Sequence, residues 1–223
     1  MKFKTANLIS FLLVLAAFAI AVWFYPRLPD PVPSHWNSAG QIDGYMAKPW
    51  GVFILPLTMT GIWIVLAVLP RISPKGYRLD TFQNIYGLIQ ITFIAALLVI
   101  TSIALTAATN RHVAINMIIP IVIGLLFVIL GNYMGKLRKN FFIGIRTPWT
   151  LASDEVWVRT HRLGGWLFVA GGLAIVITGV LAPSAYMPII MIVIIAVAAL
   201  VPAAASYVIY RRVEGFGSKD GVD

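Results

Sequence analysis

The sequence predicts an all-α protein that is a bundle of six transmembrane helices, and three observations support this. Of its 223 residues, 60% are hydrophobic and only 11% are charged, whereas a soluble domain carries about 25% charged residues. The apolar residues gather in long stretches that contain no Asp, Glu, Lys or Arg. The basic residues alternate between the two sides that these stretches would define. Together these features exclude a water-soluble globule and predict a multi-pass protein of the cell membrane.

The charge-free stretches define the individual helices. A helix needs about 20 residues to cross a hydrocarbon core of about 30 Å. The final stretch, Leu163–Tyr210, is too long for one crossing, and Pro183 and Pro188 divide it into two. The expected helices are therefore 6–25, 50–69, 86–108, 114–134, 163–182 and 188–210.

The basic residues predict how the chain is oriented. Fourteen of the 17 Lys and Arg residues lie before the first helix, in the second and fourth connections and in the tail. Only Arg27, Lys48 and Arg111 lie on the other side. Because basic loops stay in the cytoplasm, both termini are predicted to be inside. The basic excess then reflects topology and attraction to anionic membrane lipid, and direct binding of nucleic acid is not expected.

A signal peptide is the rival interpretation of the N-terminus. Lys2 and Lys4 precede an apolar run, and Ala19-Ile20-Ala21 has the small residues of a cleavage site. The apolar run continues through Val22–Tyr25, however, where a cleaved signal would become polar. An uncleaved first helix is the better interpretation, and it preserves the alternation of basic loops.

Small and polar residues within the spans predict how the helices pack. Gly165, Gly172 and Gly179 recur every seven residues, so we expect a neighbouring helix against this face. Gln90 and Asn116 are expected to form hydrogen bonds between helices. The spans contain no acidic or basic side chain, which argues against a proton- or sodium-driven transporter. The sequence leaves oligomerisation open.

The first loop, residues 26–49, is predicted to lie outside and to form a recognition surface. Its four closely spaced prolines favour a stiff, polyproline-like segment, and Asn37–Gly40 and Asp43-Gly44 are typical of turns. The candidate recognition residues are polar or aromatic: His35, Trp36, Asn37, Asp43 and Tyr45.

Sharper chemical roles for the same loop are weaker hypotheses. A divalent metal would use His35 with Asp43 or Asp30, but the zinc and calcium spacing rules are not met. General-base catalysis by His35 lacks an evident nucleophile. A loop folded through side-chain hydrogen bonds explains these residues best, so no metal, cofactor or catalytic residue is assigned.

The second loop, residues 132–162, is predicted to face the cytoplasm. Ser153 is a plausible N-cap for a helix that runs into the fifth span, and acidic residues follow it. Helical spacing would place Asp154, Trp157 and His161 on one side of that helix. Basic and aromatic residues alternate upstream, which suits anionic headgroups or a partner protein. The candidate partner residues are Asn140, Arg146, Trp149, Asp154, Trp157, His161 and Arg162.

Two motifs resemble a known family. Residues 131–135 and 140–151, followed by Trp157, Thr160-His161-Arg162 and Gly164-Gly165, are similar to the signature region of the SdpI family. The first loop, with His35-Trp36-Asn37 and Asp43-Gly44-Tyr45, resembles the uncharacterised domain that commonly precedes that region. The resemblance implies an N-terminal two-helix unit over residues 1–70 and an SdpI-like four-helix region over 71–223, with a short cytoplasmic tail.

The resemblance also implies a function. SdpI-type proteins are bacterial immunity proteins against sporulation-delaying toxins, and the founding type also holds a cytoplasmic repressor at the membrane. We therefore expect a non-enzymatic immunity and signalling protein whose partners are a toxin peptide outside and a repressor inside. The alternatives are a membrane enzyme, using His35/Asp43 or Asp154/His161/Arg146, and a small-solute transporter.

Overall fold

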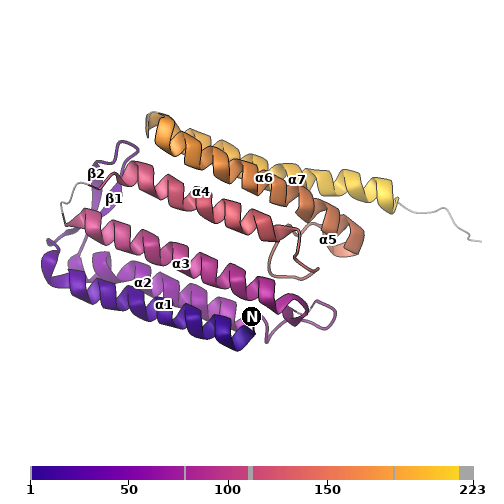
Figure 1. Ribbon diagram of the computed structural model, residues 1–223, viewed down its shortest axis with the longest axis horizontal. Helices are drawn as coiled ribbons and strands as arrows, with labels where there is room; N and C mark the ends of the chain where they lie inside the picture. Colours follow the sequence, from indigo (N-terminus) through magenta and orange to yellow (C-terminus); the bar gives the residue numbers. More distant parts are fainter. Residues whose placement is uncertain (1, 78, 110–112, 183, 216–223) are drawn as a thin grey trace, which may run out of the picture.

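The computed structural model describes residues 2–77, 79–109, 113–182 and 184–215, and it confirms the all-α membrane fold. Within these described residues, six helices are long and apolar enough to cross a membrane. They are α1 (Phe3–Phe24), α2 (Lys48–Val68), α3 (Gln83–Ala108), α4 (Ile115–Met134), α6 (Asp154–Leu181) and α7 (Met187–Val213) (Figure 1). The short elements are α5 (Pro148–Ala152), the strands β1 (Val32–Trp36) and β2 (Ile42–Met46), and the 3₁₀ turns η1 (Tyr25–Arg27), η2 (Leu79–Phe82) and η3 (Ser184–Tyr186).

The six long helices pack as two groups of three. In the first half, α1, α2 and α3 contact one another, and in the second half α6 lies between α4 and α7. The two halves meet mainly along α3 and α4, which run side by side through the middle of the molecule (Figure 1). The division at residue 70 stays a prediction, because helix packing alone does not define a domain boundary.

The helices α4 and α6 are held together by glycines, as the stripe on the fifth span predicts. A Cβ added to Gly131 would lie 2.8 Å from the carbonyl oxygen of Gly165, and one added to Gly165 would lie 2.7 Å from that of Gly131. Gly124 and Gly172 repeat this reciprocal approach at 2.6 and 2.5 Å, one heptad away. Gly179 also lies against α4. Within a bilayer the hydrophobic effect contributes little to helix association. Close backbone-to-backbone contact of this kind stabilises the helix pair through van der Waals packing instead.

The two polar residues singled out within the spans behave differently. Gln90 donates from Nε2 to Asn7 Oδ1 at 2.8 Å, so it joins α3 to α1 as predicted. Asn116 instead lies near the end of α4 against the loop that follows α1: a Cβ added to Gly40 would lie 3.2 Å from Asn116 Oδ1. This contact connects the first half to the second.

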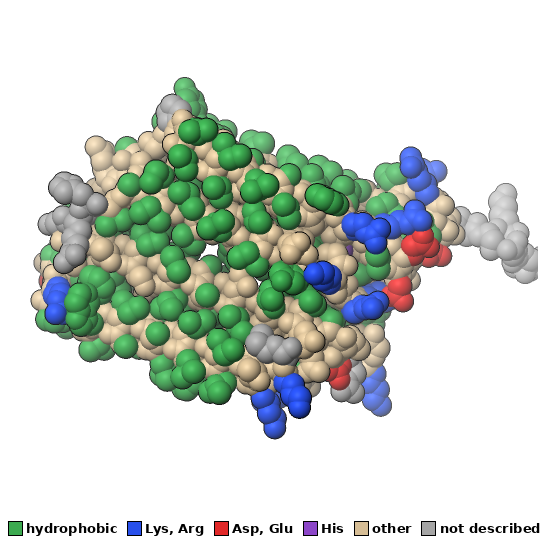
Figure 2. Space-filling model, viewed as in Figure 1, with side chains coloured by type: hydrophobic (Ala, Val, Ile, Leu, Met, Phe, Trp, Pro, Cys, Tyr) green, Lys and Arg blue, Asp and Glu red, His purple; other side chains and the backbone are tan. Residues whose placement is uncertain are grey.

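Charged side chains mark the two ends of the bundle. Most Lys and Arg gather at the end that carries α5, and the middle of the molecule is apolar (Figure 2). We call this the cap end and the opposite end, which carries β1 and β2, the hairpin end. Arg78, Arg111 and Lys219 of the basic pattern lie outside the described residues.

The first loop is a β-hairpin, which the sequence reading did not predict. β1 and β2 pair antiparallel, and the turn between them is Asn37–Gly40. The second predicted turn, Asp43-Gly44, is wrong, since both residues lie within β2 and Gly44 is opposite His35 at an irregular position of the register. A Cβ on Gly44 would lie 2.8 Å from His35 Cβ, so the glycine serves close strand approach here rather than chain reversal.

Candidate functional site

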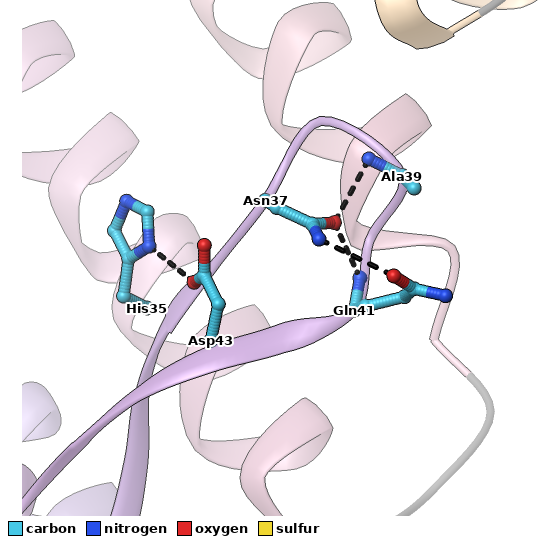
Figure 3. A network of polar contacts seen from close by, with 5 residues as sticks. All are labelled: His35, Asn37, Ala39, Gln41 and Asp43. Carbon is cyan, nitrogen blue, oxygen red and sulfur yellow. Dashed lines mark hydrogen bonds and ion pairs between the residues drawn. The ribbon is translucent and has the colours of Figure 1, made fainter.

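The exposed face of the hairpin carries a small polar network. His35 donates from Nδ1 to Asp43 Oδ1 at 2.5 Å, and both side chains are solvent-exposed. Asn37 accepts at Oδ1 from the backbone N–H groups of Ala39 and Gln41, each at 3.0 Å, and its amide donates to Gln41 Oε1 (Figure 3). Asn37 therefore builds the turn, while His35 and Asp43 present a paired, accessible polar surface.

The two aromatic candidates of the hairpin have opposite surroundings. Trp36 is half-buried and packs on an apolar cluster that includes Val32, Val52 and Leu105, so it anchors β1 to the helices below. Tyr45 is 60% exposed and projects from β2. The structure thus brings His35 and Asp43 together and leaves Tyr45 free on the same hairpin.

An open cavity of about 500 Å³ lies between the hairpin and the helix ends. One side is formed by Ser34–Ser38 of the hairpin, and the remaining walls come from α2, α3, α4 and α7, so both halves contribute. The apolar wall residues are Leu55, Ile100, Ala104, Ile115, Ile119, Pro120, Met187, Pro188 and Met191. Its size falls in the range of about 300–1,000 Å³ that is usual for ligand sites.

The polar groups of this cavity are confined to its rim. They belong to the hairpin residues Ser34, His35, Asn37 and Ser38, and to Asn116 of α4. None of the described residues that line the cavity is Lys or Arg. The cavity therefore offers apolar contact and neutral hydrogen-bonding groups, with His35 as its titratable lining residue.

At the cap end, Asn140 folds the segment between α4 and α5. Its side chain is fully buried and makes four hydrogen bonds. The amide donates to the carbonyls of Arg138 and Ile143 at 2.9 and 3.0 Å, and Oδ1 accepts from the N–H groups of Phe142 and Ile143 at 2.9 and 2.7 Å. Asn140 thus replaces regular secondary structure as the hydrogen-bond partner of this buried backbone.

Trp157 and His161 of α6 form hydrogen bonds to the same segment between α4 and α5. Their rings are stacked with centroids 4.0 Å apart on the buried face of α6, as their helical spacing predicts. Trp157 donates from Nε1 to the carbonyl of Leu137 at 2.8 Å. His161 accepts at Nε2 from the N–H of Ile145 at 2.9 Å and donates from Nδ1 to the carbonyl of Trp157 at 2.8 Å. Both nitrogens of this neutral histidine are therefore used in folding.

The remaining candidates at the cap end are accessible. Arg146 and Arg162 are exposed, and Arg146 donates to the carbonyl of Phe141. Trp149 is half-buried and lies edge-on to Tyr207 of α7. Asp154 is exposed, in contrast to the buried pair, and forms an ion pair of 2.8 Å with Lys139.

The cap is also tied to the end of α7. Ser153 caps α6 as predicted, because its hydroxyl accepts from the N–H of Val156 at 3.4 Å. The same hydroxyl donates to Glu214 Oε1 at 2.6 Å. Thr147, which caps α5, lies 2.9 Å from Ser206 of α7, oxygen to oxygen. We name residues 136–162 the cap, because these contacts make one folded unit of them.

The structure brings the first catalytic pair considered from the sequence, His35 and Asp43, together on an exposed surface, but it does not assemble the second set, Asp154, His161 and Arg146. His161 is buried with both nitrogens bonded, while Asp154 pairs with Lys139 at the surface. Among the described residues, no three His, Asp or Glu side chains converge as metal ligands would. Asp30 instead accepts from the backbone N–H of Lys48 at 3.3 Å.

The cavity walls are the functional candidates that sequence reasoning missed. They come from four helices that are far apart in the sequence, and no local pattern marks them. Two signals were available in the sequence: Asn116, a polar side chain within a membrane-spanning helix, and Pro120, which is expected to kink the same helix.

These features define a class of protein: a multi-pass membrane protein with a structured hairpin at one end and a folded cap at the other. Comparison with known proteins agrees with that class. Residues 136–206 match the model of the SdpI/YfhL protein family, and residues 12–60 match a domain of unknown function, DUF1648. The predicted resemblance to the SdpI family, including its N-terminal domain, is thereby confirmed.

One curated relative extends the likeness over nearly the whole chain. The Immunity protein SdpI of Bacillus subtilis (strain 168) is 28% identical over 212 residues, which is 94% of this chain and 98% of the relative. No solved structure matches the chain. The family match and the six apolar helices together identify a multi-pass protein of the cell membrane.

Proposed function

We propose that this chain is a non-enzymatic membrane immunity protein that protects its cell from a secreted toxin peptide. The observation that carries the proposal is the match to an immunity protein along nearly the full length of both chains. A match of that extent includes the hairpin, all six spans and the cap, so it concerns the whole architecture. In this proposal the hairpin end faces outside and the cap end faces the cytoplasm, where basic residues meet anionic lipid.

The hairpin end supports recognition of an external ligand. His35 and Asp43 form an accessible polar pair, and Tyr45 adds an exposed aromatic surface. Because the turn at Asn37–Gly40 rests on Asn116, a ligand at the hairpin would touch both halves of the molecule.

The cap end supports a second role, the holding of a cytoplasmic repressor while toxin is bound. Its buried residues, Asn140, Trp157 and His161, keep the fold, and Arg146, Trp149 and Arg162 offer charged and aromatic contact. A toxin shifts such a protein only by binding one of two states more tightly. The glycine-packed pair of α4 and α6 reaches from the cavity wall to the cap and supplies a stiff connection between the ends.

The experiment is a survival assay in a Bacillus subtilis strain that lacks its own immunity protein. Cells that express the wild-type chain are expected to survive the sporulation-delaying toxin. His35→Ala should reduce survival at equal membrane abundance, and Arg146→Ala should leave survival intact but reduce reporter expression from the repressed promoter. Lys136→Ala, also exposed at the cap end, is the matched control for Arg146→Ala.

The outcomes separate the two roles. Death of cells that carry normal amounts of the wild-type chain would contradict the immunity function. Normal survival and normal reporter expression in both variants would remove the hairpin and the cap surface from the mechanism.

A further inference from the structure

The cavity beneath the hairpin is large, is lined by both halves and is left without a role by the fold. Its 500 Å³ lies among the ends of α2, α3, α4 and α7, with Ser34–Ser38 above. At the cap end, by contrast, the two halves meet in a packed apolar cluster in which Leu79 and Tyr86 of the first half contact Leu137 and Trp157 of the second. A second open cavity, of about 390 Å³, lies beside this cluster, but its lining includes the charged residues Arg138, Lys139 and Asp154.

We propose that this cavity is the binding site for an apolar segment of the toxin peptide, with the peptide backbone held at the rim; this rests on the proposed function. The walls bear the aliphatic and thioether side chains that suit apolar residues, and Met187 and Met191 adapt to irregular shapes. The rim offers the amide of Asn116 and the hydroxyls of Ser34 and Ser38, which match the N–H and C=O groups of a peptide.

Charge distinguishes a peptide from a membrane phospholipid as the occupant. A phospholipid places a phosphate at the interface, and proteins bind phosphate with Arg, Lys or clustered N–H groups. The described lining residues include neither Arg nor Lys, and the one imidazole at the rim, that of His35, already faces the carboxylate of Asp43. A neutral rim over an apolar floor therefore favours an uncharged peptide segment.

The position of the site also explains how one ligand would influence the whole molecule. Leu55 and Ala104 belong to the first half, while Ile119 and Met191 belong to the second. An occupant in contact with both walls fixes the distance between the halves at the hairpin end.

The first test fills the cavity from its wall. Ala104→Trp places a large ring in the space, and Ala199→Trp, on the exposed surface of α7 and outside the cavity, is the matched control. Binding of the B. subtilis sporulation-delaying toxin is measured with purified protein in phosphatidylcholine/phosphatidylglycerol nanodiscs. The apparent affinity should fall at least tenfold for Ala104→Trp and by less than twofold for Ala199→Trp.

The second test blocks the rim after folding, which removes doubt about folding of the first variant. The chain has no cysteine, so Ser38→Cys can be modified alone with a bulky reagent that forms a disulfide. Modification should abolish toxin binding, and reduction should restore it. Ala47→Cys, exposed beyond β2 and outside the cavity, is the control that should bind equally in both states.

Three results decide the proposal. If wild-type protein binds toxin and both cavity alterations leave its affinity unchanged, the cavity is not the site, although the proposed function stands. If a tightly retained phospholipid is lost in Ala104→Trp while toxin affinity is unchanged, the cavity belongs to lipid and the proposal is overturned. If the wild-type chain neither binds toxin nor protects cells, the proposed function itself fails.

Discussion

Individual residues of the cap show that a sequence motif can stabilise the fold instead of contacting a partner protein. Asn140, Trp157 and His161 were expected to meet a partner, yet all three are buried and their polar atoms bond to the backbone. Gly144 belongs to the same arrangement, since its φ is +110° and an added Cβ would lie 2.3 Å from His161 Nε2. Arg146 and Arg162 of the same motif are exposed, and they are the residues that we propose for recognition.

The substitution Asn140→Ala tests this division at the level of one side chain. It removes four hydrogen bonds and leaves buried N–H and C=O groups unpaired, each of which costs about 1–3 kcal/mol. We expect a lower melting temperature in nanodiscs and faster proteolytic cleavage within residues 136–147. Lys136→Ala, exposed on the same segment, should behave as wild type. Equal protease resistance of the Asn140 variant would mean that the cap does not depend on this side chain.

At the scale of the elements, the long helices could be predicted and the hairpin could not. Helix length and the absence of charge are set by the bilayer, so a run such as Pro49–Pro70 identifies α2 to within about two residues. The strands contain proline and glycine, which are unfavourable in strands, and their pairing depends on packing of Val32 and Trp36 on the helices. The partner of the glycine stripe was likewise beyond sequence reasoning, because it required the positions of Gly124 and Gly131 in space.

The glycine contact between α4 and α6 makes a prediction for the pair of helices. Replacing a helical glycine by alanine favours an isolated helix by about 1 kcal/mol. Gly131→Ala should nevertheless destabilise the protein, since its Cβ would lie 2.8 Å from a backbone carbonyl of α6. Gly61→Ala in α2, where the added Cβ would meet no neighbouring side chain or other helix within 4 Å, should be neutral or stabilising. Thermal unfolding of the two variants in parallel measures the difference, and similar melting temperatures would argue against close helix contact.

At the scale of the whole molecule, the two ends differ in charge and in structure. The cap end gathers most of the basic side chains, while the hairpin end has few (Figure 2). Sequence reasoning predicted this asymmetry because it depends only on which loops carry Lys and Arg. It did not predict the cavity, because that space depends on how four helix ends are arranged.

Orientation in the membrane is the prediction that belongs to this scale. The chain has no cysteine, so single Cys residues introduced at Ala39 and Arg146 report the two ends without background. In intact cells a membrane-impermeant maleimide should label Ala39→Cys and leave Arg146→Cys unlabelled until the membrane is permeabilised. Labelling of Arg146→Cys alone would reverse the topology and place the hairpin in the cytoplasm.

The length of α6 has a consequence for whatever meets the cap. Its 28 residues span about 42 Å, whereas the hydrocarbon core is about 30 Å thick. The surplus of about two turns is long enough to place Asp154 to Arg162 in the headgroup layer next to the hydrocarbon core. A protein that binds residues 154–162 would therefore also contact the lipid headgroups. Its binding should vary with membrane composition as well as with the cap sequence.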